Sequence, residues 1–115
     1  MPTTEPSAGW LRGMLPLALA ALLAEADQHG YALVQHLAEH GFGNVRGGAL
    51  YPVLGRMETE GLVESRWEAG DGGPGRKVYQ LTGAGRARLR EESVTWRDFS
   101  AAMDCLLERA DKESP

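Results

Sequence analysis

The stretch from Val45 to Ser65, VRGGALYPVLGRMETEGLVES, decides how the rest of this chain is interpreted. Its apolar residues recur at helical spacing and predict a short amphipathic helix with one face against a core: Leu50, Val53, Leu54 and Met57. Gly61 ends this helix, and a β-favouring segment follows at once. The other face begins with small residues, followed by one tyrosine and one arginine. A helix with such a face can approach another molecule closely, and we interpret it as a DNA recognition helix.

Size and composition indicate one soluble domain. The chain has 115 residues and a formal net charge of −4, which argues against binding nucleic acid through bulk charge but leaves room for a local basic face. Its single cysteine, Cys105, cannot form an intramolecular disulfide, which fits a reducing cytoplasm. The apolar run Met14–Ala24 is shorter than the ~20 residues that span a bilayer, so we expect a buried helix and no membrane segment.

The residues before the central stretch predict a helix-turn-helix pair. We expect a disordered arm over residues 1–9, then a helix that starts at Pro16 and runs to about Ala26. A second helix is expected over about 30–39, with Asp27 as a candidate N-cap and His29 assisting. A glycine-bearing turn then leads into the recognition helix, as in helix-turn-helix proteins.

Two β-favouring segments after the central helix predict a hairpin. Residues 62–68 and 76–81 are expected to be strands, and the glycine-rich loop 69–75 joins them. Arg76 and Lys77 follow the loop, as expected for a wing that reaches the phosphate backbone, whereas Asp71 at the tip counts against this interpretation. The expected fold class is mainly α with a small two-stranded β wing, a winged helix-turn-helix over residues 10–82.

The C-terminal part predicts a dimerisation helix. Thr82 is a candidate N-cap for one long helix over 83–110, followed by a disordered tail over 111–115. Apolar residues from Leu89 to Ala110 are spaced by 7, 3, 4, 3 and 4, the rhythm of a helix that packs along another helix. We therefore expect a homodimer, with these contact residues: Leu11, Leu15, Leu19, Leu89, Trp96, Phe99, Met103 and Leu106.

Several segments, in order along the chain, carry a resemblance to one family. They are LRG at 11–13, LLAE at 22–25, HGY at 29–31, GGALYPVL at 47–54, EGLV at 60–63, RKVYQLT at 76–82 and Gly85. Together they resemble the PadR family of bacterial transcriptional regulators, of the short type with a single C-terminal helix. The resemblance implies a winged helix-turn-helix dimer that represses transcription by occupying an operator. In many members a small molecule, often aromatic, relieves repression.

This chain departs from the family pattern at two positions. Ala49 stands where the family commonly has serine or threonine, and Val78 replaces a common second tyrosine beside Tyr79. Both changes could shift affinity or operator preference without affecting the fold.

The expected DNA-binding residues lie at the start of the recognition helix, on its exposed face and at the wing. They are Arg46, Gly47, Gly48, Ala49, Tyr51, Pro52, Arg56, Arg76 and Lys77. Backbone amides at 47–49 would add an anion site at a helix start. Two of the side chains have alternatives: Tyr51 could be a boundary aromatic packed on its neighbours, and Arg56 a solvated arginine paired with Glu60.

Trp96 and Phe99 admit two interpretations. They are either dimer core, or the walls of a site in which two copies of Trp96 hold a small planar aromatic effector, with Trp10 lining the same cavity. We expect no metal site, because His29, His36 and His40 lack partners at metal-ligand spacing. No catalytic residues and no cofactor are expected.

A repressor that binds a pseudo-palindromic operator is the preferred function. The alternative is a winged-helix protein-interaction module that does not bind DNA, supported by the acidic net charge and Asp71.

Overall fold

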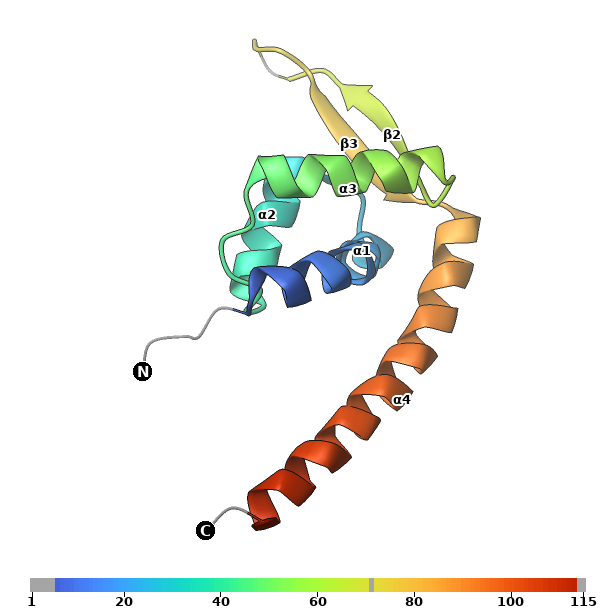
Figure 1. Cartoon of the computed structure of the whole chain (residues 1–115). Coiled ribbons are helices and arrows are strands. Elements are labelled where there is room, and N and C mark those ends of the chain that lie inside the picture. Colours follow the sequence, from blue (N-terminus) through green and yellow to red (C-terminus); the bar gives the residue numbers. More distant parts are fainter. Residues whose placement is uncertain (1–5, 71, 114–115) are drawn as a thin grey trace.

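Four helices and three short strands make up the described part of the chain, residues 6–70 and 72–113 of a computed structural model (Figure 1). The elements are α1 (Ala8–Glu25), β1 (Gln28–His29), α2 (Gly30–Glu39), α3 (Gly47–Thr59), β2 (Val63–Glu68), β3 (Arg76–Leu81) and α4 (Gly83–Glu113). Mainly helical structure with a β hairpin between α3 and α4 confirms the predicted fold class.

The first helix begins earlier than predicted. Ser7 caps α1 by accepting a 3.3 Å hydrogen bond from the backbone N–H of Trp10, so Pro16 lies inside the helix and not in its first turn. An interior proline costs about 3 kcal/mol or more, but the burial of three leucines next to it offsets that cost: Leu15, Leu19 and Leu23. Residues 8 and 9 of the expected disordered arm are therefore helical, while residues 1–5 lie outside the described residues.

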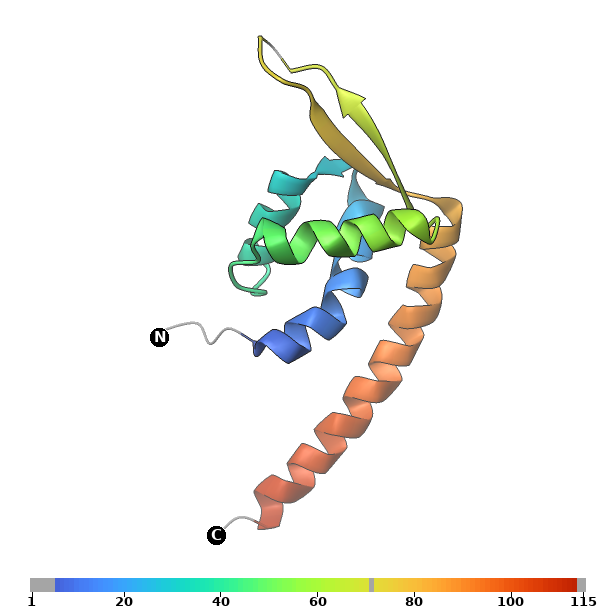
Figure 2. The same ribbon diagram turned by 45° about the horizontal axis from the view of Figure 1, so that its top comes forward.

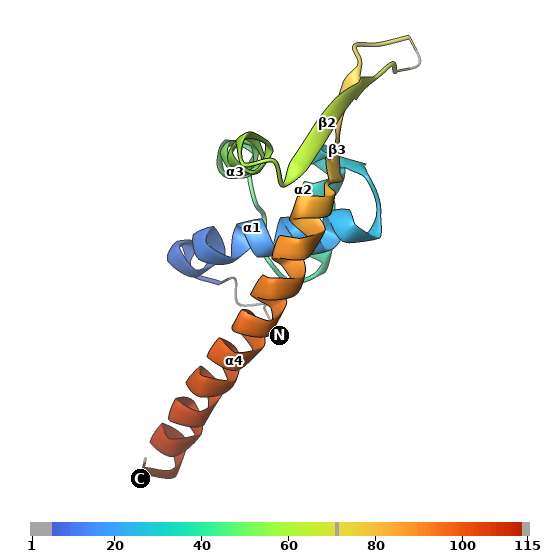
Figure 3. The same cartoon turned by 90° about the vertical axis from the view of Figure 1, so that its right-hand side faces the viewer.

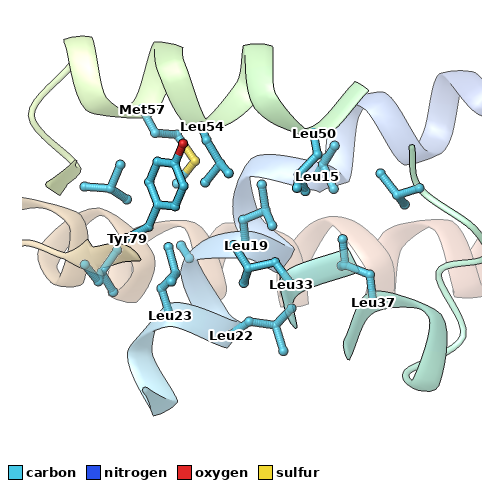
Figure 4. Close-up of a cluster of buried hydrophobic side chains, with 14 residues drawn as sticks. Leu15, Leu19, Leu22, Leu23, Leu33, Leu37, Leu50, Leu54, Met57 and Tyr79 are labelled. Atoms are coloured by element: carbon cyan, nitrogen blue, oxygen red, sulfur yellow. The ribbon is translucent and has the colours of Figure 1, made fainter. Parts of the chain in front are cut away.

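Leucines of three helices form the core. Side chains from α1, α2 and α3 meet in one cluster, with Tyr79 of β3 closing one end (Figure 4). Leu19, Leu33, Leu50 and Leu54 are completely buried. Because Leu15 and Leu19 are buried inside the protomer, they have no surface to offer a second subunit, and the expectation that they form dimer contacts is wrong.

α1 contains the apolar run Met14–Ala24, for which a buried helix and no membrane segment was expected. With 18 residues and a mean hydropathy of 1.2, α1 is long and apolar enough to cross a bilayer. The same test is passed by core helices of soluble proteins, and the leucine face of α1 packs against α2 and α3. The leucine face of α1 thus lies in the core, although only 28% of the helix is buried.

A strand that the sequence did not predict extends the wing into a three-stranded sheet. β1 pairs antiparallel with β3, and β3 pairs with β2, in the order β1-β3-β2. Gln28 of β1 is buried; its amide donates to the Leu22 carbonyl at 2.9 Å, and its Oε1 lies 2.6 Å from His36 Nδ1. His29 caps α2 by accepting from the Ala32 N–H, as predicted, whereas Asp27 is not the cap.

The last helix leaves the core and extends away from it. Thr82 accepts a 3.0 Å hydrogen bond from the Gly85 N–H, which confirms it as the cap of α4. Only the first part of α4 lies beside the rest of the domain, and its C-terminal half projects alone (Figures 1 and 3). The described chain is accordingly elongated, 63 × 34 × 21 Å. α4 continues to Glu113, so residues 111–113 of the expected tail are helical, and 114–115 lie outside the described residues.

The junction between wing and α4 should not tolerate a side chain at Gly85. A Cβ at this position would overlap the carbonyl oxygen of Leu62 and the Leu81 side chain, whereas one at Gly83 would meet nothing within 4 Å. We expect Gly85→Ala to lower the free energy of unfolding in urea by about 1–3 kcal/mol and Gly83→Ala to leave it nearly unchanged. Equal stabilities of the two variants would contradict this packing.

Candidate nucleic-acid interface

Small residues recur along the exposed face of α3, which also carries Tyr51 and Arg56. Gly48, Pro52 and Gly55 follow one another at helical spacing, and all are exposed. A Cβ at Gly48 or Gly55 would meet no atom within 4 Å, so packing inside the chain does not require glycine at either position. The backbone of α3 is therefore open to close approach by another molecule, as the sequence indicated.

The start of α3 offers fewer free amides than predicted. Arg46 is the N-cap, is exposed, and makes no side-chain cap hydrogen bond. The N–H of Ala49 already donates to the Arg46 carbonyl at 3.0 Å. Of the three amides proposed as an anion site, that of Ala49 is thus engaged within the helix.

Tyr51 has features of both of its predicted interpretations. Its ring lies so close to the start of α2 that a Cβ at Gly30 would be 2.7 Å from the ring carbons Cε1 and Cζ. On the other side, a Cβ at Gly47 would be 3.2 Å from Cε2. The side chain nevertheless keeps 50% of its surface exposed. The ring therefore occupies space that Gly30 and Gly47 leave open, and half of its surface stays accessible.

Glu58 joins α3 to the wing. Its carboxylate accepts hydrogen bonds from Ser65 Oγ of β2 at 2.5 Å and from Lys77 Nζ of β3 at 3.4 Å. The hydrogen bond from Ser65 lowers the pKa of Glu58; partial burial opposes this shift and Lys77 adds to it. Lys77 also lies 5.5 Å from the centre of the Tyr79 ring. Lys77, predicted as a free phosphate contact, is thus paired within the protomer.

The other cations of the wing differ in how free they are. Arg66 donates to Asp27 at 3.0 Å and to Glu68 at 3.1 Å, so two carboxylates neutralise it. Arg76 Nη1 lies 3.2 Å from His29 Nε2, a contact that brings no carboxylate to the guanidinium. Both arginines are exposed. Arg76, like Arg46, has no carboxylate partner among the ion pairs of residues 6–70 and 72–113.

Arg56 lies at the edge of the α3 face. It lines a cleft of about 300 Å³ between α1, α3 and α4, together with Glu60, Arg88 and Glu92. The pair with Glu60 that the spacing suggested does not occur among the ion pairs of residues 6–70 and 72–113. Arg56 therefore lies on the side of α3 that faces α4, away from Gly47 and Gly48 at the start of the helix.

One exposed aromatic residue of the wing was not among the DNA-binding residues predicted from the sequence. Trp67 of β2 is 73% exposed and lies directly across the sheet from Lys77. The period-two alternation of strand residues was the available signal, since it places residues 67 and 77 on one face once the hairpin register is known.

The predicted effector residues are only partly brought together. Trp96 and Phe99 lie side by side on α4, with ring centres 6.4 Å apart, and are 40% and 61% exposed. Trp10 lies in the first turn of α1 and is 74% exposed. In the described part of the chain, no group of three His, Cys, Asp or Glu side chains could hold a metal ion.

Comparison with known proteins relates this chain to one family of transcriptional regulators. The model of the transcriptional regulator PadR-like family matches residues 19–91. Transcriptional regulator Rv3488 of Mycobacterium tuberculosis is 45% identical over 69 residues, which cover 60% of this chain and 63% of that protein. The chain thus spans less than two thirds of that relative.

Solved structures agree over most of the chain. A PadR family transcriptional regulator from Eggerthella lenta is 36% identical with a TM-score of 0.78, and the match covers 87% of each chain. A PadR-like transcriptional regulator from Bacillus cereus is 34% identical with the same TM-score of 0.78, covering 87% of this chain and 97% of that one.

The contact between Glu58 and the wing should contribute stability that depends on pH. Because the pKa of Glu58 is lowered in the folded chain, this contribution is present above the unfolded pKa of about 4.3 and is lost as pH falls through the folded value. We expect the difference in free energy of unfolding between wild type and Glu58→Gln to be constant near pH 7 and to shrink below about pH 4. Urea titrations at several pH values measure it.

Glu64→Gln is the matched control, because Glu64 is exposed on β2 and lies on the face of that strand opposite to Ser65, the partner of Glu58. A difference for Glu58→Gln that stays the same from pH 7 to pH 3 would contradict a structural role of the charged carboxylate.

Proposed function

Because the chain belongs to the PadR-like family of transcriptional regulators, we propose that it binds operator DNA as a homodimer and represses transcription. The observation that carries the proposal is the exposed face of α3, whose glycines are not required by internal packing. A recognition helix with such a face can lie deep in the major groove and bring its backbone close to the bases.

The wing and the helix start supply the remaining contacts. Arg46 precedes α3 and Arg76 begins β3, and both are exposed. Tyr51, whose ring lies beside Gly30 and Gly47, is half exposed. Phosphate contacts by the arginines position the duplex, and contacts from α3 to base edges select the sequence.

The surface of α4 supports the homodimer. Apolar side chains remain exposed along this helix, where no other element of the described chain covers them: Phe99, Met103, Leu106 and Leu107. A second copy of the same helix can cover this stripe, since the spacing of its apolar residues suits packing along another helix. The two-fold symmetry of the dimer would then be mirrored in a pseudo-palindromic operator.

A small planar aromatic effector is part of the proposal. Trp96 and Phe99 lie together on the stripe that the second copy would cover, so the dimer would bring two such pairs near one another. A flat ligand between the two Trp96 rings would alter the spacing of the recognition helices. The proposed location is the cytoplasm, where the operator is.

An interaction module that does not bind DNA is the second candidate. The net charge of −4 and the internal pairing of Lys77 and Arg66 favour it, because these features reduce attraction to phosphate. The two functions are separated by whether the protein binds duplex DNA in a salt-dependent way.

Duplex DNA binding should depend steeply on salt and on Arg46 and Arg76. We expect mobility-shift titrations against genomic fragments to reveal binding that weakens with added salt. Arg46→Ala and Arg76→Ala should each weaken it several-fold and lower the slope of log K against log salt by about 0.9 per lost phosphate contact, or about twice that in a dimer.

Arg88→Ala is the matched control, because Arg88 lies on α4 and is paired with Glu92 at 3.6 Å. Absence of salt-sensitive binding to any fragment would leave the interaction module as the function.

The apolar stripe of α4 should set the oligomeric state. We expect Leu106→Asp to convert the dimer to a monomer in sedimentation analysis, since a buried charge at the helix contact is unfavourable. Asp104→Ala, two residues away on an exposed position, should remain dimeric. A dimer that persists in Leu106→Asp would place the subunit contact elsewhere.

A further inference from the structure

We infer that Trp67 is a DNA contact of the wing, its indole ring packing against sugars and base edges in the groove next to the one that α3 enters. The inference rests on the proposed DNA-binding function. It adds an aromatic contact to an interface otherwise described through arginines and helix backbone.

The register of the hairpin places Trp67 on the face of the wing that looks toward α3. Val63, Ser65 and Trp67 alternate along β2 and lie opposite Leu81, Tyr79 and Lys77 of β3. At the base of this face, Ser65 and Lys77 are bound to Glu58 of α3. Trp67 is the next residue of β2 on the same face and lies directly across from Lys77. The loop end of the hairpin projects beyond α3 (Figure 2).

The ring of Trp67 has little support inside the protomer. It is 73% exposed, and a Cβ at Gly75 would lie 3.6 Å from its Cε3 atom, which places the indole beside the backbone of the return strand. Aromatic side chains bury about 150–250 Å² when they are covered. An indole held at its edge and open over the rest of its surface is available to a large partner.

A second copy of the chain is a poor occupant of this surface. The apolar stripe proposed as the subunit contact lies on α4, and the tip of the hairpin and the C-terminal half of α4 lie at opposite ends of the molecule (Figures 1 and 3). Duplex DNA is the occupant that fits, because the face carrying Trp67 is continuous with the exposed face of α3 through Lys77 and Glu58.

The pairing of charges on the wing explains why an aromatic contact matters here. Arg66 is held by Asp27 and Glu68, and Lys77 by Glu58, so two of the wing's cations are neutralised before DNA arrives. An indole ring needs no free charge: it gains from apolar contact with sugars, and its N–H can donate to an acceptor in the groove. Apolar side chains can also insert between base steps in the minor groove.

The test uses a duplex cut from a genomic fragment that the wild-type protein binds, labelled for fluorescence anisotropy. We expect Trp67→Ala to weaken binding at least about 5-fold, because the apolar contact of the ring is lost, and Trp67→Phe to retain most of the affinity. The slope of log K against log salt should stay at the wild-type value, because no phosphate contact is lost.

Val94→Ala is the control, since Val94 is also an exposed apolar residue, at 57%, but lies on α4. In the double variant Trp10→Phe, Trp96→Phe, all tryptophan emission comes from Trp67, because the chain has three tryptophans. We expect DNA to quench or shift that emission over the concentration range in which anisotropy reports binding.

The outcomes separate the two proposals. Wild-type protein that binds no duplex would end the proposed function itself. Wild-type binding that Trp67→Ala leaves unchanged, or Trp67 emission that does not respond when the duplex binds, would overturn the aromatic contact alone. Loss of affinity with a lower salt slope would also overturn it, since this result would mean that the wing had moved and taken its arginines away.

Discussion

The carboxylate of Glu58 connects the two parts of the candidate DNA interface. It lies on α3 and binds one residue from each strand of the hairpin, Ser65 and Lys77, so the wing has a defined position relative to the recognition helix. Without that contact, only the short connection through Gly61 and the packing at the base of the hairpin would orient the wing. The same contact pairs the charge of Lys77 with a carboxylate. The wing is therefore oriented relative to α3, but Lys77 is less available to a phosphate. The surface that remains available to a partner consists of the exposed face of α3 and three exposed side chains: Arg46, Arg76 and Trp67.

Much of the fold could be predicted because local patterns agreed with the tertiary structure. The second helix was expected over about 30–39 and spans Gly30–Glu39, and the second strand of the hairpin has the predicted bounds of 76–81. Thr82 caps the last helix, as its place before Gly83 indicated. These elements have strong signals of their own: apolar spacing, glycine at the turns, and β-branched or aromatic residues in the strands.

The errors have a common origin in tertiary contacts. Pro16 signals a helix start locally, but the leucines around it gain enough from burial to carry the helix through it. Leu15 and Leu19 looked available to a second subunit because the sequence does not show that α2 and α3 cover them. β1 has two residues and exists only through pairing with β3. The pairing of Lys77 with Glu58 and the exposure of Trp67 also depend on tertiary contacts, because both follow from how the hairpin strands pair and pack on α3.

The central claim is that α3 and the wing act as one surface toward duplex DNA. Backbone hydrogen exchange, compared with and without a bound genomic duplex, tests it most directly. We expect DNA to slow exchange in two segments together, residues 46–52 at the start of α3 and residues 66–70 and 76–78 of the wing, and to leave the C-terminal half of α4 unchanged. Protection confined to α4, or to one of the two segments without the other, would contradict it.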